Sequence, residues 1–261
     1  MQNLILVKLG GSAITDKTKR KSANLKVIIQ LAKEIAKARQ KTKDLFLIGH
    51  GQGSFAHVPA KKYKTAEGNI NRQSAIGLAK VRQECIELNA IIIDAFIKNQ
   101  IPVINFEPHA LLTTNSKNIS SIFPNPIITA LKNNLVPIIY GDTIMDKTIG
   151  WTILSGEEIL NKLAEKLAEF KPKIIIEVGR TEGVLDQNGK TIPEINNKNY
   201  QSIKKVLGGS KSADVTGGMT HKIKQALAIA QKGIPTLLIS SKPGNLKNAI
   251  EGKKVSGTWI S

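Results

Sequence analysis

Short apolar runs recur along the chain, and each is bounded by polar or turn-forming residues. Five of them have the length and aliphatic content of buried strands, and a sixth follows late: Leu4–Leu9, Leu45–Ile48, Val103–Phe106, Val136–Tyr140, Lys173–Val178 and Thr236–Ile239. Continuous apolar runs of this kind are typical of strands that are covered on both faces. The pattern therefore predicts a buried, mainly parallel sheet.

Between these runs the spacing of apolar positions becomes helical, at residues 24–40, 72–99, 125–134, 156–170 and 219–232. Strands that alternate with helices favour a parallel sheet with helices on both sides. We therefore expect the α/β fold class, as a three-layer α/β/α sandwich. It would form a single domain over 1–261, with two lobes that join near residues 141–172. Residues 184–192, with a turn at Asp186–Gly189, predict a hairpin inserted in the second half.

The composition indicates the location of the protein and the kinds of site it can contain. The chain has 41% apolar residues, and no apolar run approaches the roughly 20 residues that span a bilayer. The N-terminus lacks the features of a signal peptide, so we expect a cytoplasmic protein without a membrane partner. The single cysteine, Cys85, excludes an internal disulfide and is expected to pack in a helix. The four histidines lack the spacing of a zinc site, and we predict no metal-binding residues.

The net charge is +18, from 38 basic and 20 acidic residues. Basic proteins often bind nucleic acid. Here the lysines are spread over nearly every predicted helix, without aromatic residues between them for base stacking. We therefore expect anionic small molecules, rather than nucleic acid, as partners.

Glycines mark three positions along this pattern. Gly10-Gly11-Ser12 follows the first strand, Gly51-Gln52-Gly53-Ser54 follows the second, and Gly217-Gly218 precedes a predicted helix. A glycine turn between strand and helix lets backbone N–H groups approach an anion, and the helix N-terminus adds positive potential. Several such turns, with lysines beside two of them, indicate a protein that holds more than one phosphate-like group.

Two lysines and a histidine accompany these turns. Lys8 lies inside an otherwise apolar strand, where an unpaired charge is costly to bury. It either reaches solvent at the strand end or faces phosphate oxygens at the carboxyl edge of the sheet. Lys222 follows Gly218 on the first helical turn. His57, six residues after Gly51, is either a satisfied hydrogen-bonding side chain or a contact to the bound anion.

Familiar nucleotide motifs are missing. A Walker loop, the dinucleotide fingerprint and the protein-kinase signatures are all absent from the sequence. A nucleotide site in this chain must be of another type.

The ordered motifs resemble the isopentenyl phosphate kinases of the amino acid kinase superfamily through nearly the whole chain. They are Lys8-Leu-Gly-Gly-Ser12-Ala-Ile-Thr-Asp-Lys17, His50-Gly-Gln-Gly-Ser-Phe-Ala-His57, Tyr140-Gly-Asp142, Ser155-Gly-Glu157 and Asp214-Val-Thr-Gly-Gly-Met219-Thr-His-Lys222. The motif that ends in His57 is the most specific, because acetylglutamate, aspartate and uridylate kinases lack that histidine. The resemblance implies transfer of the γ-phosphoryl group of MgATP to isopentenyl phosphate in isoprenoid biosynthesis, usually by a homodimer.

The resemblance also implies roles for single residues. An acceptor lobe (about 1–150) and a nucleotide lobe (about 151–261) would adjoin. Catalysis would use Lys8, Lys17, His57, Glu157 and Lys222. ATP would contact Lys8, Gly10, Gly11, Ser12, Lys17, Gly179, Arg180, Gly183, Gly217, Gly218 and Lys222. The acceptor would contact Gly51, Gln52, Gly53, Ser54, His57, Ile76, Asp142 and Gly156.

Four positions depart from the family pattern. Gln52 and Ala56 replace glycines, Glu157 replaces an aspartate, and Gly179-Arg180 replaces a Thr-Asp pair. Three other functions therefore stay open: another small-molecule kinase such as a fosfomycin kinase, a non-catalytic anion- or nucleotide-binding protein on this fold, and a basic nucleic-acid binder. Arg180 would either contact ATP or point to solvent.

Overall fold

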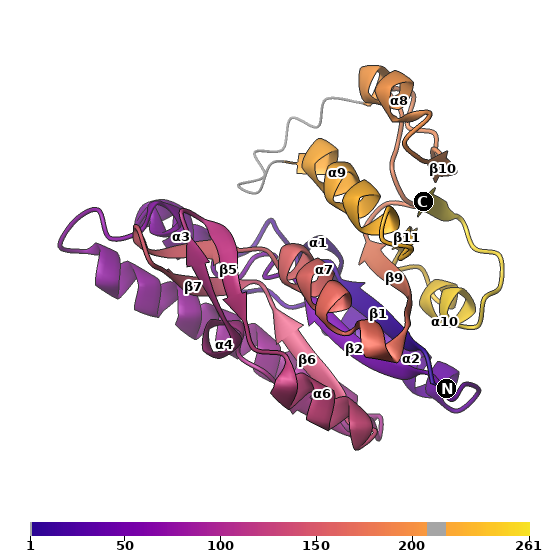
Figure 1. Ribbon diagram of the computed structural model, residues 1–261, viewed down its shortest axis with the longest axis horizontal. Helices are drawn as coiled ribbons and strands as arrows, with labels where there is room; N and C mark the ends of the chain where they lie inside the picture. Colours follow the sequence, from indigo (N-terminus) through magenta and orange to yellow (C-terminus); the bar gives the residue numbers. More distant parts are fainter. Residues whose placement is uncertain (1, 208–217) are drawn as a thin grey trace.

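The computed structural model describes residues 2–207 and 218–261 (Figure 1). Its central sheet has the strand order β10-β12-β11-β9-β1-β2-β6-β3. The strands are β1 (Leu4–Leu9), β2 (Leu45–His50), β3 (Val103–Asn105), β6 (Val136–Tyr140), β9 (Pro172–Gly179), β10 (Glu194–Ile195), β11 (Thr236–Ser240) and β12 (Gly257–Ile260). Neighbours from β11 to β3 are parallel, whereas β12 runs antiparallel to β11.

Helices cover both faces of this sheet. One face is packed by α2 (Leu25–Arg39), α4 (Ser74–Lys98) and α10 (Asn245–Ile250), the other by α6 (Asn125–Lys132), α7 (Gly156–Lys166) and α9 (Gly218–Ala230). Side chains of β1 alternate between the two cores, with Val7 in the first and Leu6 in the second. The predicted three-layer α/β/α sandwich with a mainly parallel sheet is confirmed.

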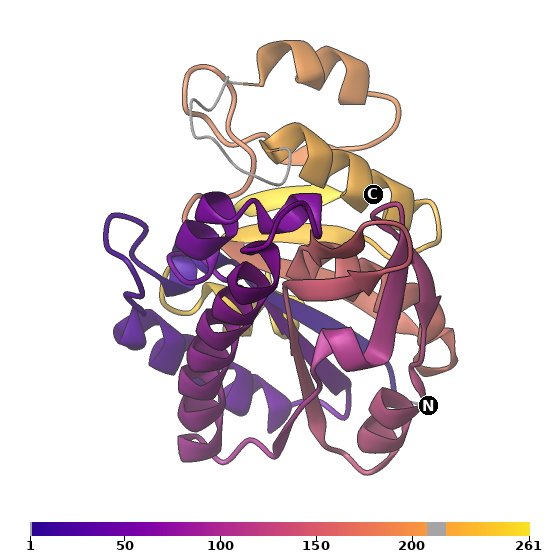
Figure 2. The same cartoon turned by 90° about the vertical axis from the view of Figure 1, so that its left-hand side faces the viewer.

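A second sheet of four strands lies at one end of the molecule, beside α3 (Figure 1). Its order is β5-β4-β7-β8, from β4 (Leu112–Asn115), β5 (Asn118–Ile122), β7 (Asp142–Asp146) and β8 (Gly150–Leu154). Figure 2 shows the long helix α4 along the outside, with α3 near one of its ends. The short helices are α1 (Gly11–Ile14), α3 (His57–Lys62), η1 (Thr65–Glu67), α5 (Pro108–Leu111), η2 (Ala168–Phe170) and α8 (Tyr200–Val206).

The six predicted strands and five predicted helices are present, with differences at their ends. The helix predicted at 156–170 is divided, because α7 ends at Lys166 and a separate 3-10 turn follows at Ala168–Phe170. The hairpin predicted at 184–192 has only a single antiparallel bridge, between Leu185 and Thr191. The four-stranded sheet was not predicted.

The two halves of the chain meet inside one sheet. Strands β1, β2, β3 and β6 come from the first half, and β9 to β12 come from the second, so that β1 and β9 form the junction. The assignment of the acceptor to one half and the nucleotide to the other stays a prediction. Among the described residues, no helix combines the length and apolar character that a bilayer crossing requires.

Candidate active site

A cavity of about 490 Å³ opens where β1, β2 and β9 end. Parallel sheets place ligands at this carboxyl edge. Most of the predicted site residues line it: Lys8, Gly10, Gly11, Ser12, Lys17, Gly51, Gln52, Gly53, His57, Asp142, Gly156, Glu157, Gly179, Arg180, Gly183, Gly218 and Lys222. Segments far apart in the sequence thus contribute to one hollow, as the motifs predicted.

Two of the described residues that were predicted for the site, Ser54 and Ile76, do not line the cavity. Ser54 is buried behind it, where its hydroxyl donates to the carbonyl of Ser22. Ile76 is 52% exposed on α4. Gly217 lies outside the described residues.

The two glycine turns after β1 and β2 pack backbone against backbone. A Cβ atom on Gly11 would lie 2.3 Å from the nitrogen of Gly53, and one on Gly51 would lie 3.0 Å from the nitrogen of Gly11. Gly10 is equally confined, since its Cβ would lie 2.6 Å from the carbonyl oxygen of Val178. Glycine is required at these positions because the chains approach so closely. The cavity floor is therefore bare backbone, which suits close approach by phosphate oxygens.

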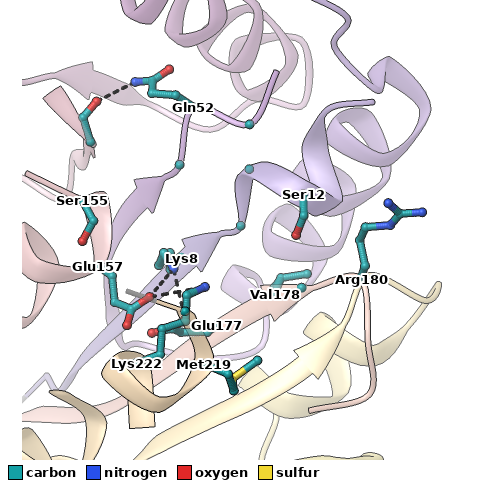
Figure 3. A pocket seen from close by; sticks show the side chains of 18 of the residues that line it. Lys8, Ser12, Gln52, Ser155, Glu157, Glu177, Val178, Arg180, Met219 and Lys222 are labelled. Carbon is teal, nitrogen blue, oxygen red and sulfur yellow. Dashed lines mark hydrogen bonds and ion pairs between the residues drawn. The ribbon is translucent and has the colours of Figure 1, made fainter. Parts of the chain in front are cut away.

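Four charged side chains meet beside this floor (Figure 3). The Lys8 ammonium lies 2.7 Å from Oε2 of Glu157 and 3.1 Å from Oε2 of Glu177. Lys222 from α9 approaches the same Glu157 oxygen at 3.7 Å. Lys8, Glu157 and Glu177 are buried, and the Lys222 side chain is about one-third exposed. Lys8 therefore does not extend into solvent at the end of its strand. It is a buried cation that two carboxylates hold beside the cavity.

Local structure explains why these groups converge. Lys8 and Glu177 are direct neighbours in the parallel pairing of β1 with β9, so that both side chains point to the α7 side of the sheet. Glu157 lies in the first turn of α7, where Ser155 caps the helix by accepting a hydrogen bond from the backbone N–H of Glu158. The sheet register and one helix cap thus set the positions of three charges.

The environment shifts the pKa values of this cluster. Burial alone would lower the pKa of Lys8, but Glu157 and Glu177 raise it above its ordinary value. Burial acts to raise the pKa of Glu157, yet Lys8 and Lys222 bring it below the usual range. Burial and the neighbouring Glu157 raise the pKa of Glu177. The two carboxyl groups therefore differ in their proton affinity. Glu157 is held in its ionised form, and Glu177 accepts a proton more readily.

Glu177 was missed in the sequence analysis. A signal was available, because it is the lone acid in the run Ile174-Ile-Ile-Glu177-Val178. A buried lysine on one strand requires a partner, and a lone acid near the end of another core strand is a candidate.

The side of the cavity next to the second glycine turn carries an amide and an imidazole, from Gln52 and His57, in place of the ion cluster. Gln52 donates from Nε2 to the carbonyl of Gly141 at 2.7 Å, tying the second glycine turn to the start of β7. His57 lines the cavity at the start of α3, directly after Ala56. Ala56 has a left-handed backbone, with φ of 65°, and its N–H donates to Glu84 at 2.7 Å. The glycine usual in the family would adopt this conformation without strain.

Beyond His57 the wall becomes apolar, lined by Ala56, Ala60, Val81, Cys85 and Ile153. The described α4 residues that face the cavity are thus Val81 and Cys85, five and nine residues beyond Ile76. Buried Asp142 closes this end and is held by Arg82 at 2.8 Å. A phosphate-binding floor with an apolar extension fits a phosphate monoester of an aliphatic chain.

Arg180 follows β9 at the rim. Its side chain is exposed and directed away from Lys8 and Glu157 (Figure 3). Two roles were predicted for Arg180, contact with ATP and exposure to solvent. From this position Arg180 could contact only those parts of a nucleotide that lie at the cavity mouth.

A sequence model of the amino acid kinase family matches residues 3–240. The chain is 34% identical to an isopentenyl phosphate kinase of Methanocaldococcus jannaschii, over 98% of each chain. It is 30% identical to one of Methanothermobacter thermautotrophicus, over 99% of each. A structure described as "X-ray structures of isopentenyl phosphate kinase" superposes with a TM-score of 0.84 at 27% identity, covering 99% of this chain and 100% of that one. This chain therefore belongs to the amino acid kinase family, among its isopentenyl phosphate kinases.

Proposed function

We propose that this protein transfers the γ-phosphoryl group of ATP to the phosphate of isopentenyl phosphate, giving isopentenyl diphosphate and ADP. The observation that carries the proposal is the ion cluster of buried Lys8 and Glu157 with the partly exposed Lys222, at the meeting point of two glycine turns. Cations placed over a backbone cradle stabilise the charge that develops during phosphoryl transfer.

In this mechanism the ATP phosphates contact Gly10, Gly11, Ser12, Lys17, Gly218 and Lys222. The acceptor phosphate contacts Gly51, Gly53 and His57. An oxygen of the acceptor attacks the γ-phosphorus, and the bond from that phosphorus to the β–γ bridging oxygen breaks. Lys8 and Lys222 lie where they would face the transferring group, and Glu157 fixes both ammonium groups. No general base is needed, since a phosphate monoester is already ionised at neutral pH.

Magnesium would enter with ATP, coordinated by the phosphate oxygens. The described residues contain no group of three or more His, Cys, Asp or Glu side chains that could hold a metal ion. When bound, Mg²⁺ supplies further charge neutralisation on the phosphates.

The apolar wall supports the choice of acceptor. Val81, Cys85 and Ile153 would contact the hydrocarbon part of isopentenyl phosphate, with His57 at its phosphate. A role in isoprenoid biosynthesis, a cytoplasmic location and a homodimeric state are further parts of this proposal. Sedimentation of the purified protein tests the dimer.

A panel of acceptors tests the function. The purified chain is incubated with MgATP and, separately, with isopentenyl phosphate, fosfomycin, or no acceptor, and ADP release is measured. We expect turnover with isopentenyl phosphate only. Preference for fosfomycin would reassign the acceptor, and nucleotide binding without turnover on either would indicate a non-catalytic protein. Salt-sensitive binding to random DNA would instead favour a nucleic-acid binder.

A further inference from the structure

Two buried carboxyl groups, rather than one, face the buried Lys8. Glu157 accepts from its ammonium group at 2.7 Å and Glu177 at 3.1 Å (Figure 3). The charged groups that face Glu177 come from three elements: Lys8 on β1, Glu157 on α7 and Lys222 on α9. On its other side, β11 pairs Leu238 with Glu177 and adds no charge. Among the residues that the structure describes, the cluster comprises two cations and two carboxyl groups.

The balance of charge in this cluster changes when negatively charged phosphate groups enter the cavity. Glu157 has two cationic partners, so that it still has Lys222 if Lys8 turns toward phosphate oxygens. Glu177 has Lys8 as its hydrogen-bonded cation, so it loses that partner if Lys8 turns toward phosphate oxygens. A buried carboxylate left between Glu157 and incoming phosphates is strongly disfavoured as an anion. Its burial already favours the neutral form.

We propose that Glu177 is a positioning residue that holds Lys8 in the free enzyme and takes up one proton from solvent when the phosphates bind, releasing Lys8 to the transferring group. The proposal rests on the kinase function above. The proton binds the Glu177 carboxylate as its hydrogen bond from Lys8 breaks. It returns to solvent as the products leave and that hydrogen bond reforms, so the phosphoryl-transfer reaction itself is unchanged.

Proton uptake is measurable directly. The full-length protein is titrated calorimetrically with Mg²⁺ and the ATP analogue that has an imido group between its β- and γ-phosphorus atoms. Two buffers of different ionisation enthalpy at one pH give the number of protons bound. We compare the wild type with Glu177→Gln, which has the shape of a protonated glutamate and cannot titrate. Glu165→Gln is the matched control, since Glu165 lies on α7 with lysine partners outside the cavity.

At a pH between the pKa of Glu177 in the free enzyme and its higher pKa in the complex, we expect the wild type and Glu165→Gln to take up more protons than Glu177→Gln, by a difference approaching one per site. Ionisation of the nucleotide itself is common to all three proteins and cancels. Glu177→Asp keeps a titratable carboxyl group at this position and should therefore retain the proton uptake. It provides a second variant for the comparison if Glu177→Gln folds poorly.

Kinetics give a second readout. Because the protonated form of Glu177 is the active one, wild-type kcat should fall as pH rises through the pKa of Glu177 in the complex. Glu177→Gln should hold its kcat to higher pH. Equal proton uptake and parallel pH profiles for the two proteins would overturn the proposal while leaving the kinase function intact. Failure of the wild type to bind the nucleotide analogue would overturn both.

Discussion

At the scale of single residues, Lys8 shows how a buried charge is made tolerable. Its side chain is 7% exposed and is held by two carboxylates. Removing one member of a buried ion pair typically costs about 3–5 kcal/mol, because the partner charge stays buried without compensation. Glu157 retains Lys222, so the main effect falls on Glu177.

Lys8→Met should therefore lower the free energy of unfolding more at pH 8 than at pH 5. Without Lys8, the folded-state pKa of Glu177 lies further above its unfolded value. The stability linked to that group is fully present below the unfolded pKa and is lost as pH rises through the folded pKa. Urea unfolding of variant and wild type at both pH values measures the difference. The double variant Lys8→Met/Glu177→Gln should remove this pH dependence, whereas an equal loss at both pH values in Lys8→Met would contradict the argument.

His57 lies at the start of α3, beside the second glycine turn, and we propose that it contacts the acceptor phosphate. His57→Ala should lower kcat/KM for isopentenyl phosphate by about 10²-fold, as expected when one oriented polar group at developing charge is lost. ATP affinity should change little, because the ATP phosphates are assigned to Lys222 and the first glycine turn. Val58→Ala, one residue along and half-exposed, is the control. Near-normal turnover by His57→Ala would remove the histidine from the acceptor site.

The predicted residues that line the cavity are mostly ones whose type was itself unusual in its pattern, and their roles there stay predictions. A lysine in an apolar strand and glycines after strands needed no tertiary information. The apolar wall could not be predicted without tertiary information. The rotation of α4 about its axis decides that Val81 and Cys85, rather than Ile76, face the cavity. Glu177 was overlooked since its meaning depends on which strand pairs with β1.

At the scale of elements, the closeness of the two glycine turns is the feature most sensitive to change. Gly11→Ala would place a Cβ 2.3 Å from the Gly53 nitrogen, and backbone on both sides cannot move independently. We expect a loss of about 1–3 kcal/mol in the free energy of unfolding, as for overpacking in a core. The loss should be accompanied by weaker binding of both substrates, because both turns shift.

Gly179→Ala provides the comparison for stability. Its Cβ would meet only the carbonyl oxygen of Ile239, at an ordinary 3.9 Å. Chemical unfolding should show a change within about 0.5 kcal/mol. If Gly11→Ala were equally harmless, the close packing of the turns would not be needed for the fold.

Element prediction was most accurate for the central sheet. The six strands from β3 to β11 in its order are short apolar runs that need no partner to be recognised, whereas β10 and β12 were not predicted. The four-stranded sheet was missed because β4 and β5 are short and rich in Thr, Asn and Ser. In addition, only Gly141 separates β6 from β7, so the sequence offers no clear boundary. Pairing among these strands, rather than their composition, defines them.

At the scale of the whole molecule, the two halves share their cores. The first core joins Phe46 and Leu88 with Ile174 and Leu246, which come from opposite halves of the chain. The second core does the same, with Leu6 and Leu47 beside Ile175 and Ile229. Neither half can bury its sheet faces alone, so a single cooperative unit is expected even if the two halves bind different substrates, as we propose.

The two tryptophans allow this cooperativity to be measured. Trp151 lies in β8 of the four-stranded sheet, and Trp259 lies in β12 at the other end of the central sheet. Trp259→Phe leaves a reporter in the four-stranded sheet, and Trp151→Phe leaves one in β12. Within each variant, urea unfolding followed by fluorescence and by far-UV circular dichroism should give the same midpoint. The region around Trp259 is the critical case, because it adjoins a third, smaller core that includes Ile195, Tyr200 and Ile260. An earlier fluorescence transition for Trp259 alone would show that this end opens separately, and the nucleotide side would then be a subdomain with its own stability.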